Sequence, residues 1–154
     1  MKILITGGAG FIGSHLCDAL IKNNHEITIV DNLSLGSLNN LKHLNTKTNI
    51  SFFQEDILNL EFMKNIFAEG KFDVVFHLAA NSDIAKSLEN PLIDFNNTFM
   101  TTFNILSCMR EFNVKNIVFA STSAIYGDTN KKITEDYGPL FPASHYGASK
   151  LSSE

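Results

Sequence analysis

The chain has 154 residues, a formal net charge of −4 and 44% hydrophobic residues. This composition predicts one globular domain with a substantial core, and the absence of a basic cluster argues against a nucleic-acid partner. No apolar run approaches the ~18 residues that a membrane span needs, and we expect no signal peptide because the sequence opens directly on a strand pattern. Cys17 and Cys108 are isolated in helical patterns, which predicts buried thiols. We therefore expect a cytoplasmic protein with no membrane partner.

Apolar patterns of two kinds alternate along the chain, which indicates strands and helices in turn. In chain order we expect a strand at Lys2–Thr6, a helix at Phe11–Lys22, strands at Glu26–Asp31 and Ile50–Gln54, a helix at Leu60–Glu69, a strand at Phe72–Leu78, a long helix from Pro91 to about Phe112, a strand at Lys115–Ser121 and a helix from about His145. In the first helix we expect Ile12, Leu16, Ala19 and Leu20 to face inward. Strands that alternate with helices imply a parallel sheet covered on both faces, so the fold class is a doubly wound α/β domain.

The segment TGGAGFIG, residues 6–13, joins the first strand to the first helix. Gly7 permits the tight turn, Gly10 lets the backbone approach a pyrophosphate, and Gly13 lets the helix pack closely on the strand. The helix N-terminus then offers N–H groups and a positive dipole end to the phosphates. Asp31, at the end of the second strand, can accept both adenosine ribose hydroxyls and repels a 2′-phosphate, so NAD is favoured over NADP. A glycine turn without a ligand is the alternative.

A second motif lies near the other end, where Tyr146 and Lys150 share one helical face. A phenol with a pKa near 10 is a poor base at neutral pH, but an adjacent lysine and a positive nicotinamide ring favour the phenolate. Such a tyrosine can remove a proton from a sugar hydroxyl while a hydride leaves the same carbon. A hydroxyl of residues 121–123 is placed to share that proton. For a Tyr-x-x-x-Lys pattern in isolation, an exposed pair without a catalytic role is the alternative.

Further motifs occur between these two, in the order and spacing of one family. The set is TGGAGFIGSHL (6–16), VDNLSLG (30–36), Asp56-Ile57, HLAA (77–80), STSAIYG (121–127) and YGASK (146–150). The chain resembles the extended short-chain dehydrogenase/reductases, most closely their NAD-dependent nucleotide-sugar epimerases of the UDP-glucose 4-epimerase type. The resemblance implies a Rossmann-type sheet, a UDP-hexose substrate, no metal, and catalysis by Thr122, Tyr146 and Lys150. It implies that NAD is held by Gly7, Gly10, Phe11, Ile12, Gly13, Asp31, Asn32, Asp56, Ile57, Leu78, Ala79, Ala80, Tyr146 and Lys150.

The family resemblance also implies a reaction, in which NAD takes a hydride from C4 and returns it to the other face of the rotated 4-keto sugar. Related sugar 4,6-dehydratases carry an acid directly after the catalytic threonine. This chain has Ser123 and Ala124 there, so epimerisation is favoured and a dehydratase is the alternative. A non-catalytic NAD-binding module is a second alternative, against which the retained tyrosine and lysine argue.

Some positions depart from the family or stay open. Thr98 stands where the family has an asparagine, so the role of that residue is in doubt here. His77 and His145 lie beside motifs, and we expect them to pack or to support other residues rather than to react. Tyr126 can contact substrate or fill the junction between strand and loop.

Family members are about twice this length, so we expect residues 1–154 to be the NAD-binding half, without a C-terminal substrate domain and without turnover by itself. In the family, the long central helix and the helix of the Tyr-Lys pair form a dimer interface. A helically spaced apolar set lies on the former: Phe95, Phe99, Phe103 and Leu106. We therefore expect a homodimer, although all four side chains could instead pack on the sheet.

Overall fold

A five-stranded parallel sheet forms the centre of the molecule. The computed structural model describes residues 1–44 and 47–154. The strands are β1 (Lys2–Thr6), β2 (Glu26–Val30), β3 (Ile50–Phe53), β4 (Val74–His77) and β5 (Ile117–Phe119). Their order in space is β3-β2-β1-β4-β5, and each neighbouring pair is parallel. The doubly wound α/β fold is confirmed, and the strand order reverses between β1 and β4.

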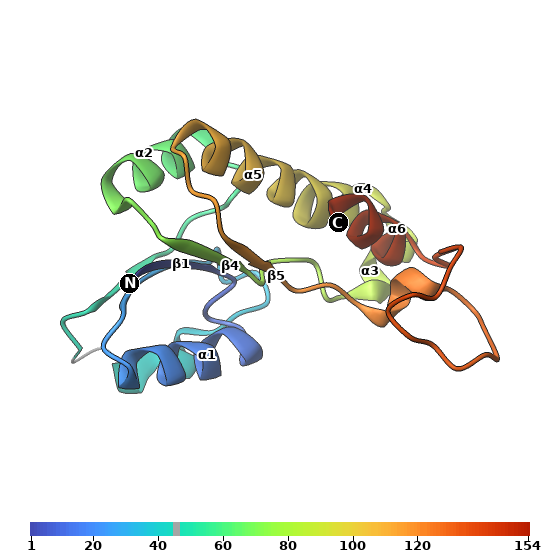
Figure 1. Ribbon diagram of the computed structural model, residues 1–154, viewed down its shortest axis with the longest axis horizontal. Coiled ribbons are helices and arrows are strands. Elements are labelled where there is room, and N and C mark those ends of the chain that lie inside the picture. Colours follow the sequence, from blue (N-terminus) through green and yellow to red (C-terminus); the bar gives the residue numbers. More distant parts are fainter. Residues whose placement is uncertain (45–46) are drawn as a thin grey trace.

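Helices cover both faces of this sheet (Figure 1). One face carries α1 (Phe11–Lys22) and the 3₁₀ helix η1 (Leu38–Leu44), and the other carries α2 (Leu60–Gly70) and α5 (Thr101–Glu111). Alternation along β1 divides the core, because Ile3 and Ile5 pack on the α1 side and Leu4 packs on the side of α2 and α5. No helix among the described residues is long and apolar enough to cross a membrane.

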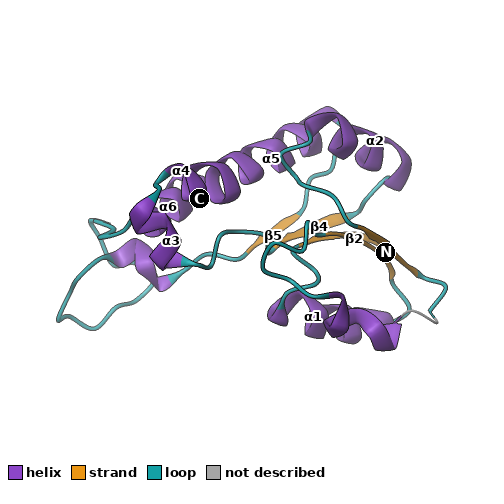
Figure 2. Cartoon of the chain, turned by 180° about the vertical axis from the view of Figure 1, so that it is seen from behind, coloured by secondary structure: helices purple, strands orange, loops and turns teal. Residues whose placement is uncertain are grey.

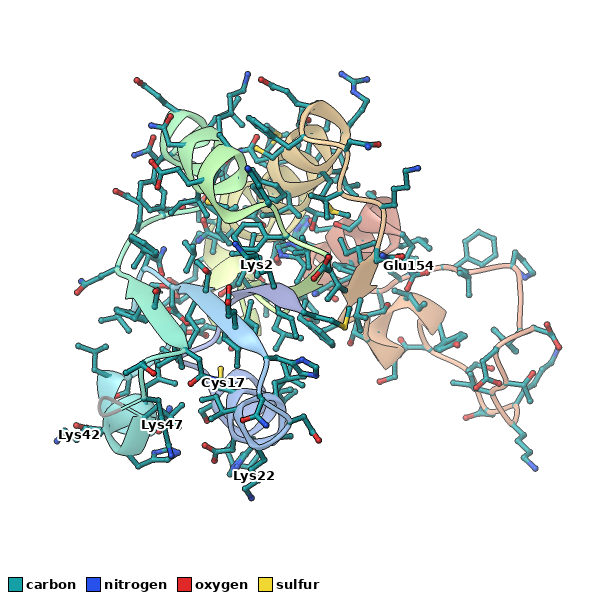
Figure 3. All side chains as sticks on the ribbon, turned by 60° about the vertical axis from the view of Figure 1, so that its left-hand side comes forward. Lys2, Cys17, Lys22, Lys42, Lys47 and Glu154 are labelled. Atoms are coloured by element: carbon teal, nitrogen blue, oxygen red, sulfur yellow. The ribbon has the colours of Figure 1, made fainter. Side chains whose placement is uncertain are left out.

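Each half of the core contains one cysteine, and both thiols are free and buried as expected. Cys17 lies between α1 and the sheet (Figure 3), and Cys108 lies in the opposite half. Burial raises the pKa of the Cys17 thiol to about 12 and that of the Cys108 thiol to about 11. Both thiols therefore act as small apolar groups that fill the core.

The inward face of α1 differs from the expected one. Ile12 is 66% exposed and Ala19 is also exposed, whereas the buried residues of the helix are Gly13, Ser14 and Cys17. The helix approaches the sheet through these small side chains. Its larger apolar side chains therefore do not point directly at the sheet, as had been predicted. Leu16 and Leu20 are half-buried at the edge of the contact.

The long central helix is present but is not a regular α-helix. It consists of α4 (Leu92–Asp94), the π-helical segment η2 (Phe95–Met100) and α5. The hydroxyls of Thr101 and Thr102 both donate to the Thr98 carbonyl, at 3.0 and 2.8 Å. Side chains that bind a carbonyl of the preceding turn compete with the α-helical ladder, which accounts for the irregular winding here.

Three further short helices were not predicted: η1, α3 (Ile84–Glu89) and the 3₁₀ helix η3 (Ser123–Tyr126). The last helix, α6 (His145–Ser153), begins at the expected residue. It packs against η2, η3, α3 and α4. Figure 2 shows α3, α4 and α6 gathered at the end of the long helix, beyond the carboxyl end of β5.

His77, the last residue of β4, ties the centre of the sheet to α5. Its Nδ1 lies 2.6 Å from the Thr6 hydroxyl and its Nε2 lies 3.0 Å from the Thr102 hydroxyl. The imidazole is fully buried and stacks on Phe119 with centroids 5.9 Å apart. Burial and, secondly, the charge of Lys150 lower the pKa of His77 to about 3. The side chain therefore packs as a neutral group, the supporting role expected for it.

This buried imidazole makes the stability of the protein depend on pH. Above about pH 6.5 the His77 ring is neutral in both the folded and the unfolded chain. Below that value His77 binds a proton in the unfolded chain but stays neutral in the folded chain. We expect this to lower the free energy of unfolding by about 2 kcal/mol at about pH 5 relative to about pH 7.5, as measured by urea denaturation. His77→Gln should remove this contribution, and the same change at the exposed His15 should keep it. An unchanged pH dependence in His77→Gln would contradict the assignment.

Candidate functional site

A cavity of about 720 Å³ opens at the carboxyl ends of the strands, where the strand order reverses. Open α/β sheets bind their ligands at such a point. All residues expected to hold the cofactor line this cavity: Gly7, Gly10, Phe11, Ile12, Gly13, Asp31, Asn32, Asp56, Ile57, Leu78, Ala79, Ala80, Tyr146 and Lys150. Thr122 is the one expected site residue that is not part of the lining. The fold thus brings both motifs to one space.

The glycine turn lies against the chain that follows β4. Gly7 has a φ of +72°, and a Cβ at this position would lie 2.7 Å from the main-chain nitrogen of Ala79. A Cβ at Gly13 would lie 2.4 Å from the Gly7 carbonyl oxygen. Gly10 caps α1 without a side-chain hydrogen bond. The first N–H groups of α1 are thus left to face the cavity, where they favour an anion.

The Asp31 carboxylate is held at one end of the cavity by two backbone N–H groups. Oδ2 accepts from Ala9 at 2.9 Å and Oδ1 accepts from Leu33 at 2.8 Å. A Cβ at Gly36 would lie 3.0 Å from either carboxylate oxygen, so the loop after β2 closes tightly over the group. Each oxygen keeps acceptor capacity for a ligand hydroxyl, and the fixed charge disfavours a second anion. Asp56 lines the same cavity and accepts from the Asn32 amide at 2.9 Å.

Lys150 lies at the opposite end and is buried. Its Nζ donates to the Ala120 carbonyl at 2.6 Å and lies 4.6 Å from the centre of the Phe119 ring. Burial lowers the pKa of Lys150 to about 8, while the charge of Glu154 acts in the opposite direction. Glu154 itself accepts a hydrogen bond from Ser121 at the end of β5, and Figure 3 shows it beside that strand. The ammonium group is therefore fixed by the end of β5.

The pKa of the Tyr146 hydroxyl is raised by its surroundings within the protein. Burial raises the pKa of Tyr146, a hydrogen bond with Thr122 lowers it, and the charge of Asp94 raises it further. The Lys150 ammonium donates to the Ala120 carbonyl at 2.6 Å. Thr122 thus contacts Tyr146 from outside the cavity lining, and its hydroxyl also accepts from the Ala124 N–H at 3.2 Å.

The sequence left the roles of Thr98, Tyr126 and His145 open, and the structure shows what surrounds each of them. The Thr98 hydroxyl, at the family's asparagine position, accepts from the Asn81 N–H at 3.2 Å. Tyr126 packs edge-on against Tyr137 with ring centres 5.9 Å apart, so it fills the loop junction. His145 is exposed in the first turn of α6 and does not pack in the core.

Sequence reasoning missed much of the wall beside Tyr146. This wall includes Asn81, Lys86 and Asn97, which line the cavity, and Asp94, which lies buried behind it. Asp83 caps α3 and pairs with Lys86, whose Nζ lies 3.3 Å from its Oδ2. The signal in the sequence was the polar run Asn81-Ser82-Asp83, which follows the fourth expected strand after two alanines.

Comparisons with known proteins agree with this architecture. The profile of the family described as GDP-mannose 4,6 dehydratase matches residues 4–154. The UDP-glucose 4-epimerase of Bacillus subtilis (strain 168) is 39% identical, with 100% of this chain and 46% of that protein covered. The structure of Thermotoga maritima UDP-glucose 4-epimerase with UDP-glucose has a TM-score of 0.91 and 39% identity, and covers 99% of this chain and 48% of that one. The structure of the Thermus thermophilus UDP-glucose 4-epimerase in complex with NAD has a TM-score of 0.89 and 35% identity, with coverage of 99% and 48%. This chain spans about half the length of the curated relatives it matches.

Proposed function

This chain belongs to the GDP-mannose 4,6 dehydratase family, and we propose that within it the chain is the NAD-binding half of a nucleotide-sugar 4-epimerase that acts on a UDP-hexose. The observation that carries the proposal is the single cavity lined by the glycine turn, by Asp31 and by the pair of Tyr146 and Lys150. The relatives named above are UDP-glucose 4-epimerases, and one of them was crystallised with NAD. They support the same substrate class and cofactor.

The cavity suits a dinucleotide. The backbone contacts at Gly7 and Gly13 leave no room for a Cβ, so the turn has the shape of a cradle for a pyrophosphate. The N-terminus of α1 supplies N–H groups to those phosphates. Asp31 supplies fixed acceptors for the ribose hydroxyls and repels a phosphate on that ribose, which favours NAD over NADP.

In the proposed reaction Tyr146 removes the proton from the sugar hydroxyl at C4 and later returns it. Bound NAD would supply the acceptor for the hydride of that carbon and the donor for its return. Thr122 shares a hydrogen bond with Tyr146 that stabilises the phenolate. Lys150 adds positive charge at this end of the cavity and is held in place by the Ala120 carbonyl.

Epimerisation is a better proposal for this chain than dehydration, in spite of the name of the family. Elimination of water needs an acid that protonates the leaving hydroxyl. Ser123 and Ala124 follow Thr122 as the first residues of η3, and neither carries a carboxyl group. Without an acid in these positions, the chemistry stops at reversible oxidation, which is what a 4-epimerase needs.

The cofactor preference can be measured on this chain by calorimetric titration. We expect tighter binding of NAD than of NADP. Asp31→Ala should weaken NAD binding about tenfold or more, because the ribose hydroxyls lose a charged acceptor. Asp128→Ala, at an exposed acid outside the cavity, should leave the affinity unchanged. Equal or tighter binding of NADP to the unmodified chain would rule the proposal out.

The role of Tyr146 can be tested by assaying the complete gene product. Tyr146→Phe should lower kcat by about 10²–10⁴, because the proton transfer is lost, while NAD binds with nearly unchanged affinity. Tyr137→Phe is the matched control, since the Tyr137 hydroxyl donates to Thr129 in the loop before α6. Near-normal epimerisation by Tyr146→Phe would show that another group is the base.

We also propose that the protein is a homodimer joined through the long central helix. Of the apolar set named from the sequence, Phe95, Phe103 and Leu106 are 48%, 54% and 43% exposed. Phe99 is half-buried and packs on Phe95. Burial of these side chains against a second copy would be favourable, because it removes apolar surface from water.

Light scattering at micromolar concentration tests this association. We expect a dimer, and Phe103→Ser should shift the population toward the monomer because one apolar contact in each copy is lost. Phe141→Ser, at a phenylalanine exposed in the loop before α6, should not change the mass. A monomer at all concentrations in the unmodified protein would refute the proposed interface.

A further inference from the structure

His77 is a buried titratable group that the proposed reaction does not use. Its ring bridges β1 and α5, because each of its two nitrogens contacts one threonine hydroxyl. All three side chains are buried: Thr6, His77 and Thr102. Each ring nitrogen of a neutral histidine is either a donor or an acceptor, and the hydrogen bonds around the ring decide which. The direction of these bonds therefore follows from the partners of the two hydroxyls.

The Thr102 hydroxyl determines the role of Nε2. This hydroxyl lies 2.8 Å from the Thr98 carbonyl oxygen, to which it donates because a carbonyl has no proton of its own. A hydroxyl carries one proton, so in its contact with Nε2 at 3.0 Å the ring is the donor. Nε2 is therefore the protonated nitrogen of His77.

The Thr6 hydroxyl determines the role of Nδ1 independently. Nδ1, at 2.6 Å, is the one hydrogen-bond partner of this hydroxyl among the described residues. A bare Nδ1 accepts the Thr6 proton, whereas a protonated Nδ1 would leave that proton unpaired in the core, which is costly. Burial and, secondly, the charge of Lys150 lower the pKa of His77, which agrees with a ring that carries one proton. The hydrogen bonds thus run in one direction, from Thr6 through the ring and Thr102 to the central helix.

This directed chain of bonds ends in the π-helical segment η2. The Thr98 carbonyl accepts from two hydroxyls, those of Thr101 and Thr102. Hydroxyl donors on a carbonyl of the preceding turn favour irregular winding over a regular α-helix. His77 keeps one of these donors aligned, because its Nε2–H faces the Thr102 oxygen and leaves the carbonyl as the acceptor of the hydroxyl proton. The imidazole thereby stabilises the irregular winding.

The central helix holds the segment after β4 at two points. At the first, His77 donates to Thr102. At the second, the Asn81 N–H donates to the Thr98 hydroxyl at 3.2 Å. The residues between these points, 78–80, line the cavity. The hydrogen bonds of His77 therefore reach the wall of the site, although the ring itself lies in the core.

We propose that His77 is a positioning residue of this site, which as the Nε2–H tautomer aligns the Thr102 hydroxyl on the Thr98 carbonyl and so fixes the π-helical stretch of the central helix against the cavity wall at 78–81. His77 is not part of the cavity lining, so it acts through the residues that it holds. That this wall receives NAD rests on the proposed function. The tautomer and its effect on the helix are properties of the ligand-free chain and do not depend on it.

The tautomer can be read directly by ¹⁵N NMR of this chain labelled at histidine. His77→Gln identifies the signals of this ring among those of the five histidines. We expect a protonated Nε2 and a bare Nδ1, with shifts that stay constant between about pH 8 and about pH 5.5 because the buried ring binds no second proton. A protonated Nδ1, alone or together with a protonated Nε2, would overturn the proposal. This measurement needs no change at Thr102, so it applies even if a variant there does not fold.

The positioning role is tested with two variants of Thr102. Thr102→Val keeps the shape of the side chain but removes the hydroxyl, whereas Thr102→Ser keeps the hydroxyl. Hydrogen exchange of the Asn81 N–H reports the hold on the wall without a ligand, because this group bonds to Thr98 in the same stretch. We expect exchange about tenfold faster in Thr102→Val and nearly unchanged in Thr102→Ser, with the amides of β1 unaffected. Unchanged exchange in Thr102→Val, equal acceleration in both variants, or acceleration that extends to β1 would each contradict the proposal.

Calorimetric titration with NAD connects this hold to the site. We expect binding to be about threefold to tenfold weaker in Thr102→Val and restored in Thr102→Ser. Ser107→Ala is the matched control, since its hydroxyl also donates to a carbonyl of the preceding turn in α5, at 2.8 Å, but lies outside the cavity lining. Unchanged affinity in Thr102→Val, or an equal loss in Ser107→Ala, would refute the positioning role. If the unmodified chain does not bind NAD, the proposed function fails while the tautomer and the exchange results stand.

Discussion

The backbone of the turn after β1 touches the backbone of the segment after β4, and the whole site depends on that contact. There is no space for a Cβ at Gly7 or at Gly13, because main-chain atoms occupy it. This closeness lets α1 start directly at the edge of the sheet with its N-terminus toward the cavity. It also places Ala79 beside the turn, so that the two strand ends on either side of the reversal in strand order bound one continuous space.

The charges of the site are arranged around this space in two groups. At one end, the Asp31 carboxylate is fixed by backbone N–H groups, which prefer a negative partner. At the other end, the Lys150 ammonium is fixed by a carbonyl and by the face of Phe119, both of which prefer a positive one. Asp94 lies buried behind the cavity wall, and its Oδ2 has no hydrogen-bond partner among the described residues. An anionic ligand with a cationic end fits this distribution better than a simple anion.

The parts of the structure that could be predicted from sequence are those with a strong local pattern. Apolar periodicity was sufficient for the sheet and its covering helices, and the glycine spacing together with Asp31 located one end of the cavity. The inward face of α1 was wrong because the smallest residues, such as Gly13, make the contact, and a count of apolar side chains ignores them. Helical spacing placed Tyr146 and Lys150 on one face. It could not reveal that the Lys150 ammonium donates to the carbonyl of Ala120, which lies outside that helix. The wall around Asn81 depends on the irregular winding of the central helix, for which hydrophobic periodicity gives no signal.

Because η2 is π-helical, the long central helix can lose one residue and still remain a helix. A π-turn accommodates one more residue than an α-turn, so the positions before Phe95 are rotated by about 100° relative to a regular helix continued backward from α5. Ile93, which precedes this segment, lines the cavity, and so do Asn97 within it and Thr101 in the next turn. Deletion of one residue within 95–100 would restore an ordinary helix without breaking it. The helix would survive, but Asp94, whose Oδ1 accepts from the Asn81 amide at 2.8 Å, would turn away from that amide.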